Sequence, residues 1–212
     1  MNLSHATVVG RFRSGYQRNN RPISLTEWRV TTADPGVASA IRDLLGGDAP
    51  QEWEAKGEDN LEVFTASKSV DITLDDPGAL QQKMILWGRN GKPDNAGRDG
   101  GAAELNLALS VHERRQRGCD EVGAEPDIDI LFRLKVAPDL GLFHFKSGSW
   151  SLASDLAQNG TEQQLADIDG RISATLSLEE VSFTAKNGPR AGQVANHSKP
   201  VLQIEAFERA RR

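Results

Sequence analysis

The feature that most constrains the fold is an alternation of apolar and polar residues that returns along the chain with a period of two. Across residues 128–136 every second side chain is apolar: Ile128, Ile130, Phe132, Leu134 and Val136. Because successive side chains of a strand point to opposite faces of a sheet, this pattern indicates a strand with one buried face. Residues 70–74, 105–111 and 172–178 alternate in the same way. The framework of the protein is therefore predicted to be a β-sheet.

Shorter segments complete the predicted sheet: residues 6–13, 24–31, 61–65, 83–88, 140–146 and 200–207. Together with the longer runs they predict a mainly antiparallel sheet of about eight to ten strands. After Leu178 the apolar phase moves to Val181 and Phe183. A β-bulge, which inserts one extra residue into a strand, would account for this shift.

The clearest helical signal begins at Asp34, which is followed by Pro35 and by spaced apolar residues that stop at Gly46 and Gly47. Aspartate is a preferred N-cap, because its side chain accepts hydrogen bonds from the first free backbone N–H groups of a helix. Proline is favoured at the first helical position and glycine just past the last one. These signals predict a helix over residues 35–45.

Two more helices are predicted in the second half of the chain. One covers residues 150–157, and the other covers residues 161–168. Thr161 and Gln164 have the spacing of a capping box, in which each side chain bonds the backbone of the other residue. The sequence thus predicts an α+β fold, with two or three helices covering the sheet in a single domain over residues 1–212.

Two long polar segments interrupt this pattern, at residues 89–103 and 185–199. The first is rich in Gly, Asn and Asp, and the second in Gly, Lys and Asn. Such compositions are typical of flexible loops, and the second loop is predicted to form the tip of a long hairpin.

The composition argues against several classes of protein. A net charge of −5 argues against a general polyanion-binding protein, because nonspecific affinity for DNA needs a surplus of Lys and Arg. The single cysteine, Cys119, rules out an internal disulfide, and with only four scattered histidines it argues against a metal site. The sequence has no apolar run long enough to span a membrane and no targeting signal, so we expect a cytoplasmic protein.

Motifs of catalysis are not found. No Gly-x-Ser-x-Gly elbow presents a serine nucleophile, and Gly88-x-x-Gly91-Lys92 runs into Pro93 instead of the Ser or Thr of a phosphate-binding loop. Carboxylates are numerous, but their spacing cannot show whether two of them face a substrate. We therefore predict no catalytic residue, no metal and no cofactor.

Arginines and aromatic residues crowd residues 10–22 of this otherwise acidic chain: Arg11, Phe12, Arg13, Tyr16, Arg18 and Arg21. Arginine beside an aromatic ring offers forked donors, planar stacking and apolar contact, which is the chemistry that carries binding energy at interfaces. We predict these six residues to bind a partner. The same residues also fit an ordinary hairpin whose arginines face solvent, since edge strands commonly carry charge as protection against aggregation.

The four tryptophans are Trp28, Trp53, Trp87 and Trp150. In a chain with so few aromatic residues they are most simply the side chains that fill the core. Trp53 is the exception, because it lies among polar and charged residues in Pro50-Gln51-Glu52-Trp53-Glu54. We predict it to be the seventh partner-binding residue.

Several strings of the sequence resemble one family of proteins. They are Val9-Gly10-Arg11-Phe12-Arg13-Ser14-Gly15-Tyr16, Leu25-Thr26-Glu27-Trp28-Arg29-Val30-Thr31-Thr32, Trp53-Glu54 leading into Asn60-Leu61-Glu62-Val63-Phe64-Thr65, Leu86-Trp87-Gly88-Arg89-Asn90-Gly91, Phe132-Arg133-Leu134 and Phe143-x-Phe145-x-Ser147-Gly148-Ser149-Trp150. Together they resemble the actinophage recombination directionality factors that work with large serine integrases. The resemblance spans most of the chain.

This resemblance implies a non-enzymatic protein that binds the integrase on attachment-site DNA. Such a factor switches recombination from integration (attP × attB) to excision (attL × attR). The resemblance also implies a contact with the C-terminal zinc-containing region of the integrase and its coiled-coil arm, without reading of the DNA sequence, in a bacterial host cell. It supplies no interface at the level of residues, so the seven residues predicted above rest on composition.

Two other functions remain open at this point. A single-stranded nucleic-acid-binding accessory protein would also use basic and aromatic residues on neighbouring strands. An enzyme with an unrecognised carboxylate site would need a dominant pocket in which two or more carboxylates converge.

Overall fold

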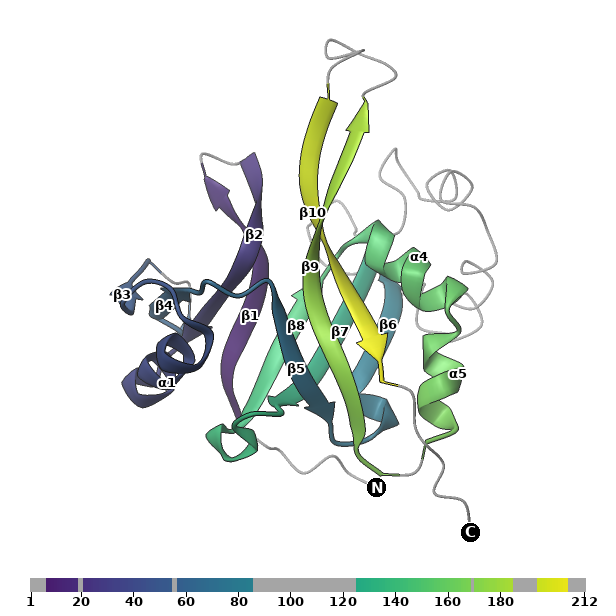
Figure 1. Ribbon diagram of the computed structural model, residues 1–212, viewed down its shortest axis with the longest axis horizontal. Helices are drawn as coiled ribbons and strands as arrows, with labels where there is room; N and C mark the ends of the chain where they lie inside the picture. The colour runs from purple at the N-terminus through teal and green to yellow at the C-terminus, as the bar shows by residue number, and fades with distance from the viewer. Residues whose placement is uncertain are drawn as a thin grey trace.

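The predicted sheet is present in the structure (Figure 1). The computed structural model describes residues 7–18, 21–54, 57–85, 125–168, 170–184 and 194–205. Its strands are β1 (Val8–Arg18), β2 (Arg21–Thr32), β3 (Gln51–Glu52), β4 (Leu61–Phe64), β5 (Ser69–Leu74), β6 (Leu80–Ile85), β7 (Glu125–Leu134), β8 (Leu142–Ser147), β9 (Ile172–Thr184) and β10 (Val194–Ile204). Its helices are α1 (Pro35–Leu45), α4 (Trp150–Gln158) and α5 (Thr161–Ala166), with short 3-10 helices η1 (Pro77–Ala79) and η4 (Pro138–Leu140). The predicted strand at 105–111 and the predicted loop at 89–103 lie outside the described residues.

The described strands form one sheet, in the order β10-β9-β5-β7-β8-β1-β2-β4-β3, and β6 pairs with β7 beside this path. Neighbouring strands pair antiparallel, with one exception: β1 and β8 are parallel. The structure therefore confirms the α+β class and the mainly antiparallel sheet.

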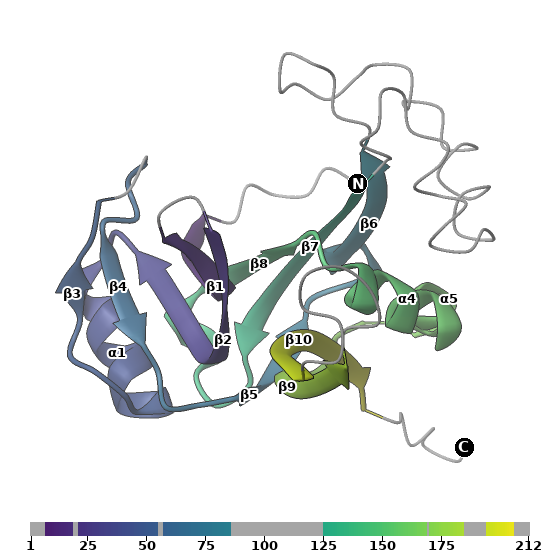
Figure 2. The same ribbon diagram turned by 90° about the horizontal axis from the view of Figure 1, so that it is seen from above.

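The sheet curls so strongly that strands distant in this order face each other. Only residues 65–68 separate β4 from β5, although the two strands occupy distant places in the sheet. This connection bridges the two regions: the backbone N–H of Thr65 donates to Trp28 O on β2 at 2.9 Å, and that of Leu178 on β9 donates to Lys68 O at 2.8 Å. Figure 2 shows β2, β1, β8, β7 and β5 arranged around a common interior.

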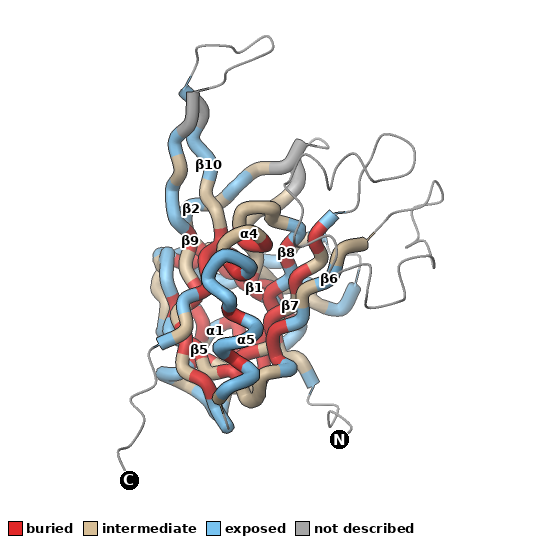
Figure 3. Tube along the Cα trace, turned by 90° about the vertical axis from the view of Figure 1, so that its right-hand side faces the viewer, coloured by how far each residue is buried: buried red, intermediate tan, exposed pale blue. Residues whose placement is uncertain are grey.

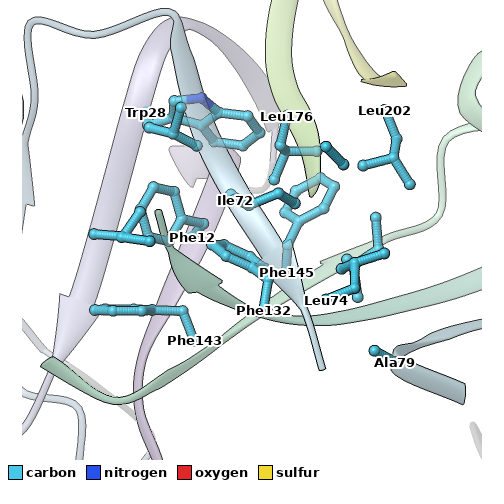
Figure 4. Packing of buried hydrophobic residues seen from close by; sticks show 14 of the residues in the cluster. Phe12, Trp28, Ile72, Leu74, Ala79, Phe132, Phe143, Phe145, Leu176 and Leu202 are labelled. Atoms are coloured by element: carbon cyan, nitrogen blue, oxygen red, sulfur yellow. The ribbon is translucent and has the colours of Figure 1, made fainter. Parts of the chain in front are cut away.

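An aromatic cluster fills this interior (Figure 4). The ring of Phe12 packs edge to face against Trp28, Phe132 and Phe143, with centroids 5.7, 5.2 and 5.5 Å apart. Trp28 makes the same kind of contact with Phe145 at 5.3 Å. Edge-to-face packing is a favoured arrangement of aromatic rings. Aliphatic side chains from β5, β9 and β10 extend the cluster: Ile72, Leu74, Leu176 and Leu202.

Helix α1 begins and ends where the sequence predicts. Asp34 is the N-cap, and its carboxylate accepts hydrogen bonds from the first free backbone N–H groups. The helix packs against β2 and β4 and ends at Leu45, with Gly46 as its C-cap. Gly47 follows with φ +99°, and a Cβ atom there would lie 2.1 Å from the carbonyl oxygen of Phe64. Only glycine fits this return from the helix to the sheet.

Helices α4 and α5 are also present, but α5 does not begin with a capping box. Gly160 is its N-cap, and Thr161 is a helical residue whose side chain is buried. The amide of Gln164 donates to a carbonyl oxygen of the preceding turn instead of closing a box with Thr161. The prediction of a capping box is therefore wrong, because the threonine side chain packs inward. Helix α4 packs against β7 and β10 (Figure 1).

Strand β7 ends at Leu134, earlier than the alternation predicts. Val136 is 68% exposed, so its assignment to the buried face is wrong. The chain turns here, through η4 and Gly141, to enter the neighbouring strand β8. The apolar side chain therefore lies beyond the edge of the core.

The β9–β10 hairpin extends beyond the rest of the described structure (Figure 3). The two strands pair from Ala174 and Ile204 out to Thr184 and Val194 without a register shift, so the predicted bulge after Leu178 is wrong. The apolar phase breaks there because the hairpin leaves the core: Glu179, Glu180 and Ser182 are exposed, and Val181 is half-buried. Residues 194–199 belong to β10 rather than to the predicted loop, and residues 185–193 lie outside the described residues.

The β1–β2 hairpin bends where its register shifts. Between Arg13 and Gly15, residues 25–28 of β2 stand opposite Ser14 alone. A Cβ atom at Gly15 would lie 2.5 Å from the carbonyl oxygen of Ile23, so only glycine allows this close approach. Irregularities of this kind increase the local twist and redirect side chains.

Candidate functional site

The outer face of strands β8, β1, β2 and β4 carries a groove with a volume of about 1010 Å³. Its principal side chains are Arg11, Arg13, Tyr16, Arg29, Trp53, Glu62, Phe64, His144 and Lys146. Along β1 and β8 the residues between them, such as Phe12 and Phe145, point into the core. The period of two therefore places aromatic rings on the inner face of these strands and cations on the outer face. We call this concavity the arginine groove.

Arg29 forms the floor of the arginine groove and is only 6% exposed. Its Nε donates to Glu62 Oε2 at 2.7 Å, and the two side chains form a salt bridge. Its Cζ lies 4.4 Å from the ring centroid of Trp53 and 5.6 Å from that of Phe64. A buried charge is tolerated only when it is paired and hydrogen bonded, and Glu62 meets that need. Cation–π contact with the rings of Trp53 and Phe64 stabilises the buried charge of Arg29 further.

Trp53 lies over the floor and is held by the loop that leads into β4. Its Nε1 donates to Asp59 O at 2.7 Å, and its backbone N–H donates to Asn60 O at 3.0 Å. The carboxylate of Asp59 accepts a hydrogen bond from Arg11 Nη1 at 3.0 Å. The Cζ of Arg13 lies 5.6 Å from the Trp53 ring. One short loop thus positions the tryptophan and one of the arginines.

Arg13 is the cation of the groove that has no carboxylate partner within the described ranges. Its Nε donates to Thr31 Oγ1 at 3.0 Å. Burial, and then the positive charges of Arg29 and Arg11, lower the pKa of Arg13 from its usual value, and the negative charge of Asp59 only partly offsets them. Because an arginine stays protonated in proteins, the site holds a positive charge that its surroundings disfavour.

The end of the groove next to the hairpin bend is apolar. The rings of Tyr16 and Phe64 pack edge to face, with centroids 6.3 Å apart. Ile23 lines the groove at the same end. A ligand in the groove would therefore meet both charge and apolar surface.

The opposite end is a network of charges on β7 and β8. His144 Nε2 lies 2.7 Å from Asp129 Oδ1, and Lys146 Nζ forms salt bridges with both Asp127 and Asp129. Burial raises the pKa of Asp129, but the hydrogen bonds from His144 and Lys146 outweigh burial and lower it overall. Burial lowers the pKa of Lys146, but its bonds to Asp127 and Asp129 outweigh burial and raise it overall.

Asp129→Asn is expected to lower the free energy of unfolding at neutral pH by about 1 kcal/mol or less, because Asp129 and its partners His144 and Lys146 are partly exposed. The pKa of Asp129 is lower in the folded protein than the ~3.9 of an unfolded chain. Its stabilisation is therefore present above that value and is lost as the pH falls through the folded pKa. Urea unfolding from neutral pH to about pH 2 should show the two proteins converging in acid.

Asp139→Asn, at an exposed position in η4, is the control for this measurement and should not alter the pH profile. A difference between wild type and Asp129→Asn that stayed constant into strong acid would contradict the charge network as the cause.

The structure brings four of the predicted partner-binding residues into the arginine groove: Arg11, Arg13, Tyr16 and Trp53. It contradicts the placement of Phe12 on a binding surface, since this side chain is 1% exposed at the centre of the aromatic cluster. The backbones of Arg18 and Arg21 lie in β1 and β2. Their side chains lie outside the described ones, so their role stays a prediction.

Sequence reasoning missed the partners that complete the groove: Arg29, Glu62, Phe64, His144 and Lys146. These residues occupy the outward-facing positions of strands that were predicted from their inward-facing apolar residues. That pattern marks a face of each strand. It does not show that β8 and β2 are the two neighbours of β1, which is what gathers these side chains.

The other tryptophans have different surroundings. Trp28 is fully buried, as predicted for a core residue. Trp150 is half-buried at the start of α4, and Trp87 lies outside the described residues.

The arginine groove gathers cations and rings rather than the groups of a catalytic site. Among its described lining residues Glu62 is the single carboxylate, and Arg29 holds it. The converging carboxylates that an unrecognised enzyme would need are thus not found there. The described ranges also contain no group of three His, Cys, Asp or Glu residues that could hold a metal ion. No helix among them is long and apolar enough to cross a membrane.

Forked cations and flat rings thus lie together on the outer face of the curled sheet. The chain belongs to the Gp3-like family, described as recombination directionality factor-like, whose model matches residues 9–205. The match covers most of the 212 residues and includes every residue of the arginine groove. It confirms the resemblance seen in the sequence. No solved structure matches the chain.

Proposed function

We propose that this protein binds a large serine integrase and switches it from integration (attP × attB) to excision (attL × attR). The observation that carries the proposal is the family match over residues 9–205. The arginine groove supports it, because arginine beside aromatic rings is typical of protein interfaces. In this role the protein makes and breaks no covalent bond and needs no cofactor.

A directionality factor must favour one arrangement of its partner over another. A ligand with equal affinity for two states shifts nothing, and a shift from 1:99 to 99:1 needs a preference of about 10⁴-fold. A preformed surface serves this purpose because little ordering is lost on binding. The paired floor at Arg29 and Glu62, with the aromatic cluster beneath the same strands, supplies such a surface.

We place the contact on the C-terminal zinc-containing region of the integrase and its coiled-coil arm. The integrase would be bound to attachment-site DNA in the cytoplasm of a bacterial host. The charge distribution supports contact with protein rather than with DNA. The chain has a net charge of −5, and Arg11, Arg29 and Lys146 in the groove are paired with carboxylates of the same chain. A continuous track for phosphates would need several unpaired cations.

Addition of the purified protein to its integrase is expected to promote attL × attR recombination and to inhibit attP × attB recombination. The physical reason is that binding energy spent on one synapse lowers its free energy relative to the other. Plasmid substrates for both reactions, resolved on gels over a titration of the protein, measure the effect. An integrase from an unrelated phage is the control and should not respond. No change in either reaction with the integrase encoded nearby would reject the proposal.

Binding of single-stranded nucleic acid is a second candidate, because basic and aromatic side chains do share one groove. It predicts that this protein alone binds an oligonucleotide and that salt weakens the binding strongly. Fluorescence anisotropy at low salt decides the matter, and a flat titration would remove this candidate.

A further inference from the structure

We propose that Arg13 is the anion-binding point of the arginine groove and that it receives a carboxylate from an acidic segment of the partner protein. The inference deepens the proposed function and rests on it for the identity of that partner, the integrase. It follows from three properties of the groove, namely an unbalanced charge, a free guanidinium edge and aromatic walls.

The charge of the groove is balanced at every arginine except Arg13. Arg11 pairs with Asp59, and Arg29 pairs with Glu62. For Arg13 the described residues provide no salt bridge, and the positive charges of Arg29 and Arg11 act on it more strongly than the negative charge of Asp59, which Arg11 already binds. An incoming carboxylate would offset this repulsion. The attraction would be stronger here than on open surface, because the site is partly buried and the effective dielectric is lower.

The guanidinium of Arg13 is held in place by one hydrogen bond, and its other donors make none to the described residues. Its Nε is bonded to Thr31 Oγ1 at 3.0 Å, and Thr31 is completely buried in β2. Its two terminal nitrogens make no hydrogen bond to a residue in the described part of the chain. Terminal nitrogens of arginine bind carboxylates in a planar fork, and a fork that is already fixed loses little entropy on binding.

The ring of Trp53 lies beside this fork, and two further aromatic rings line the same groove. Trp53 lies 5.6 Å from the Cζ of Arg13, and Tyr16 and Phe64 pack together in the same groove. Rings at these positions would shield an ion pair from water and contact an apolar neighbour of the acid. The geometry therefore fits an aspartate or glutamate that is flanked by apolar residues.

A protein carboxylate fits this site better than nucleic acid does. Affinity for nucleic acid grows with the number of phosphates that are neutralised. The groove offers one arginine that lacks a carboxylate partner in the described ranges, and the chain as a whole is acidic. One free fork matches one carboxylate.

The test measures the affinity of the full-length integrase for wild type, Arg13→Gln and Arg13→Lys by isothermal titration calorimetry. Arg13→Gln removes the charge and is expected to weaken binding by roughly 10- to 100-fold. Arg13→Lys keeps the charge without the fork and should fall between the two. Arg42→Gln is the matched control, because Arg42 is an exposed arginine of α1 already paired with Asp43. It should bind within about twofold of wild type.

A charge exchange identifies the acid on the partner. Integrase variants, each with one Asp or Glu of the coiled-coil arm or zinc-containing region reversed to Lys, are titrated against wild type and Arg13→Glu. One reversal should weaken the binding of wild type and restore the binding of Arg13→Glu. Circular dichroism of each variant confirms that it is folded. Because Arg13→Lys keeps the charge, its loss of several-fold affinity supports the inference even where Arg13→Gln folds poorly.

The outcomes separate the inference from the proposed function. If Arg13→Gln and Arg13→Lys bind the integrase as wild type does, the inference is overturned, while wild-type activity on attL × attR keeps the function. If Arg13→Gln loses binding to a single-stranded oligonucleotide but keeps its affinity for the integrase, the anion is a phosphate and the inference is likewise overturned. A wild-type protein that neither binds nor redirects the integrase rejects both.

Discussion

Replacing Phe12 by alanine is expected to lower the free energy of unfolding by about 3–5 kcal/mol. That is a large share of the 5–15 kcal/mol typical of a domain. The reason is the position of this ring, which is 1% exposed and packs edge to face against Trp28, Phe132 and Phe143. Its removal leaves a cavity between strands that cannot collapse freely, because the sheet is hydrogen bonded on both sides of β1.

Urea unfolding followed by far-ultraviolet circular dichroism measures this loss. Phe12→Leu, which restores part of the volume, should fall between wild type and Phe12→Ala. Val136→Ala, at a position that is 68% exposed, is the control and should change the stability by no more than about 0.5 kcal/mol. A Phe12→Ala protein as stable as wild type that failed only to bind the integrase would contradict the core position. It would reinstate the partner-binding role predicted from the sequence.

Removal of the carboxylate at Glu62 is expected to have the second large effect. Glu62→Ala should lower the free energy of unfolding by about 3 kcal/mol, because it leaves the charge of Arg29 buried and unpaired. The side chains of Arg29 and Glu62 are only 7% and 13% exposed, so water cannot fully replace the lost partner. The flanking rings of Trp53 and Phe64 offer cation–π contact but no hydrogen-bond acceptor for the freed Nε.

A double variant that removes both charges tests this explanation. The combined variant Arg29→Met with Glu62→Leu should recover most of the stability lost in Glu62→Ala, because no unpaired charge remains. Asp43→Ala is the matched control, since Asp43 forms an exposed pair with Arg42 on α1. Its effect should stay within about 0.5 kcal/mol. Equal losses in Glu62→Ala and in the combined variant would show that packing, rather than the buried charge, is what Glu62 contributes.

Most strands and helices of the fold could be predicted from local sequence patterns. Alternation located most of the described strands, and Asp34 with the glycines after α1 located both ends of that helix. The wrong predictions concern side chains whose positions depend on tertiary packing rather than on neighbours in the sequence. Thr161 packs inward instead of capping α5, and Val136 lies past the end of β7 although it continues the alternation.

Only part of the candidate site could be predicted from the sequence. The crowding of Arg11, Arg13 and Tyr16 with the isolated Trp53 pointed to recognition, and these side chains do line one groove. Composition could not assign Phe12 to the opposite face. Alternation alone was sufficient for that assignment, since Phe12 lies between two outward-facing arginines.

The residue pattern was thus enough to establish strands, helix ends, the α+β class and an arginine-rich segment suited to binding, because each of these depends on neighbours in the chain. The tertiary structure determined which strands pair with each other. The parallel pairing of β1 with β8 and the insertion at residues 25–28 bring together side chains from distant segments. Only these long-range contacts bury Arg29 beside Glu62 and leave Arg13 without an acidic partner in the described residues. Strand partners are chosen by the packing of the whole core, and that choice is not encoded in any single segment.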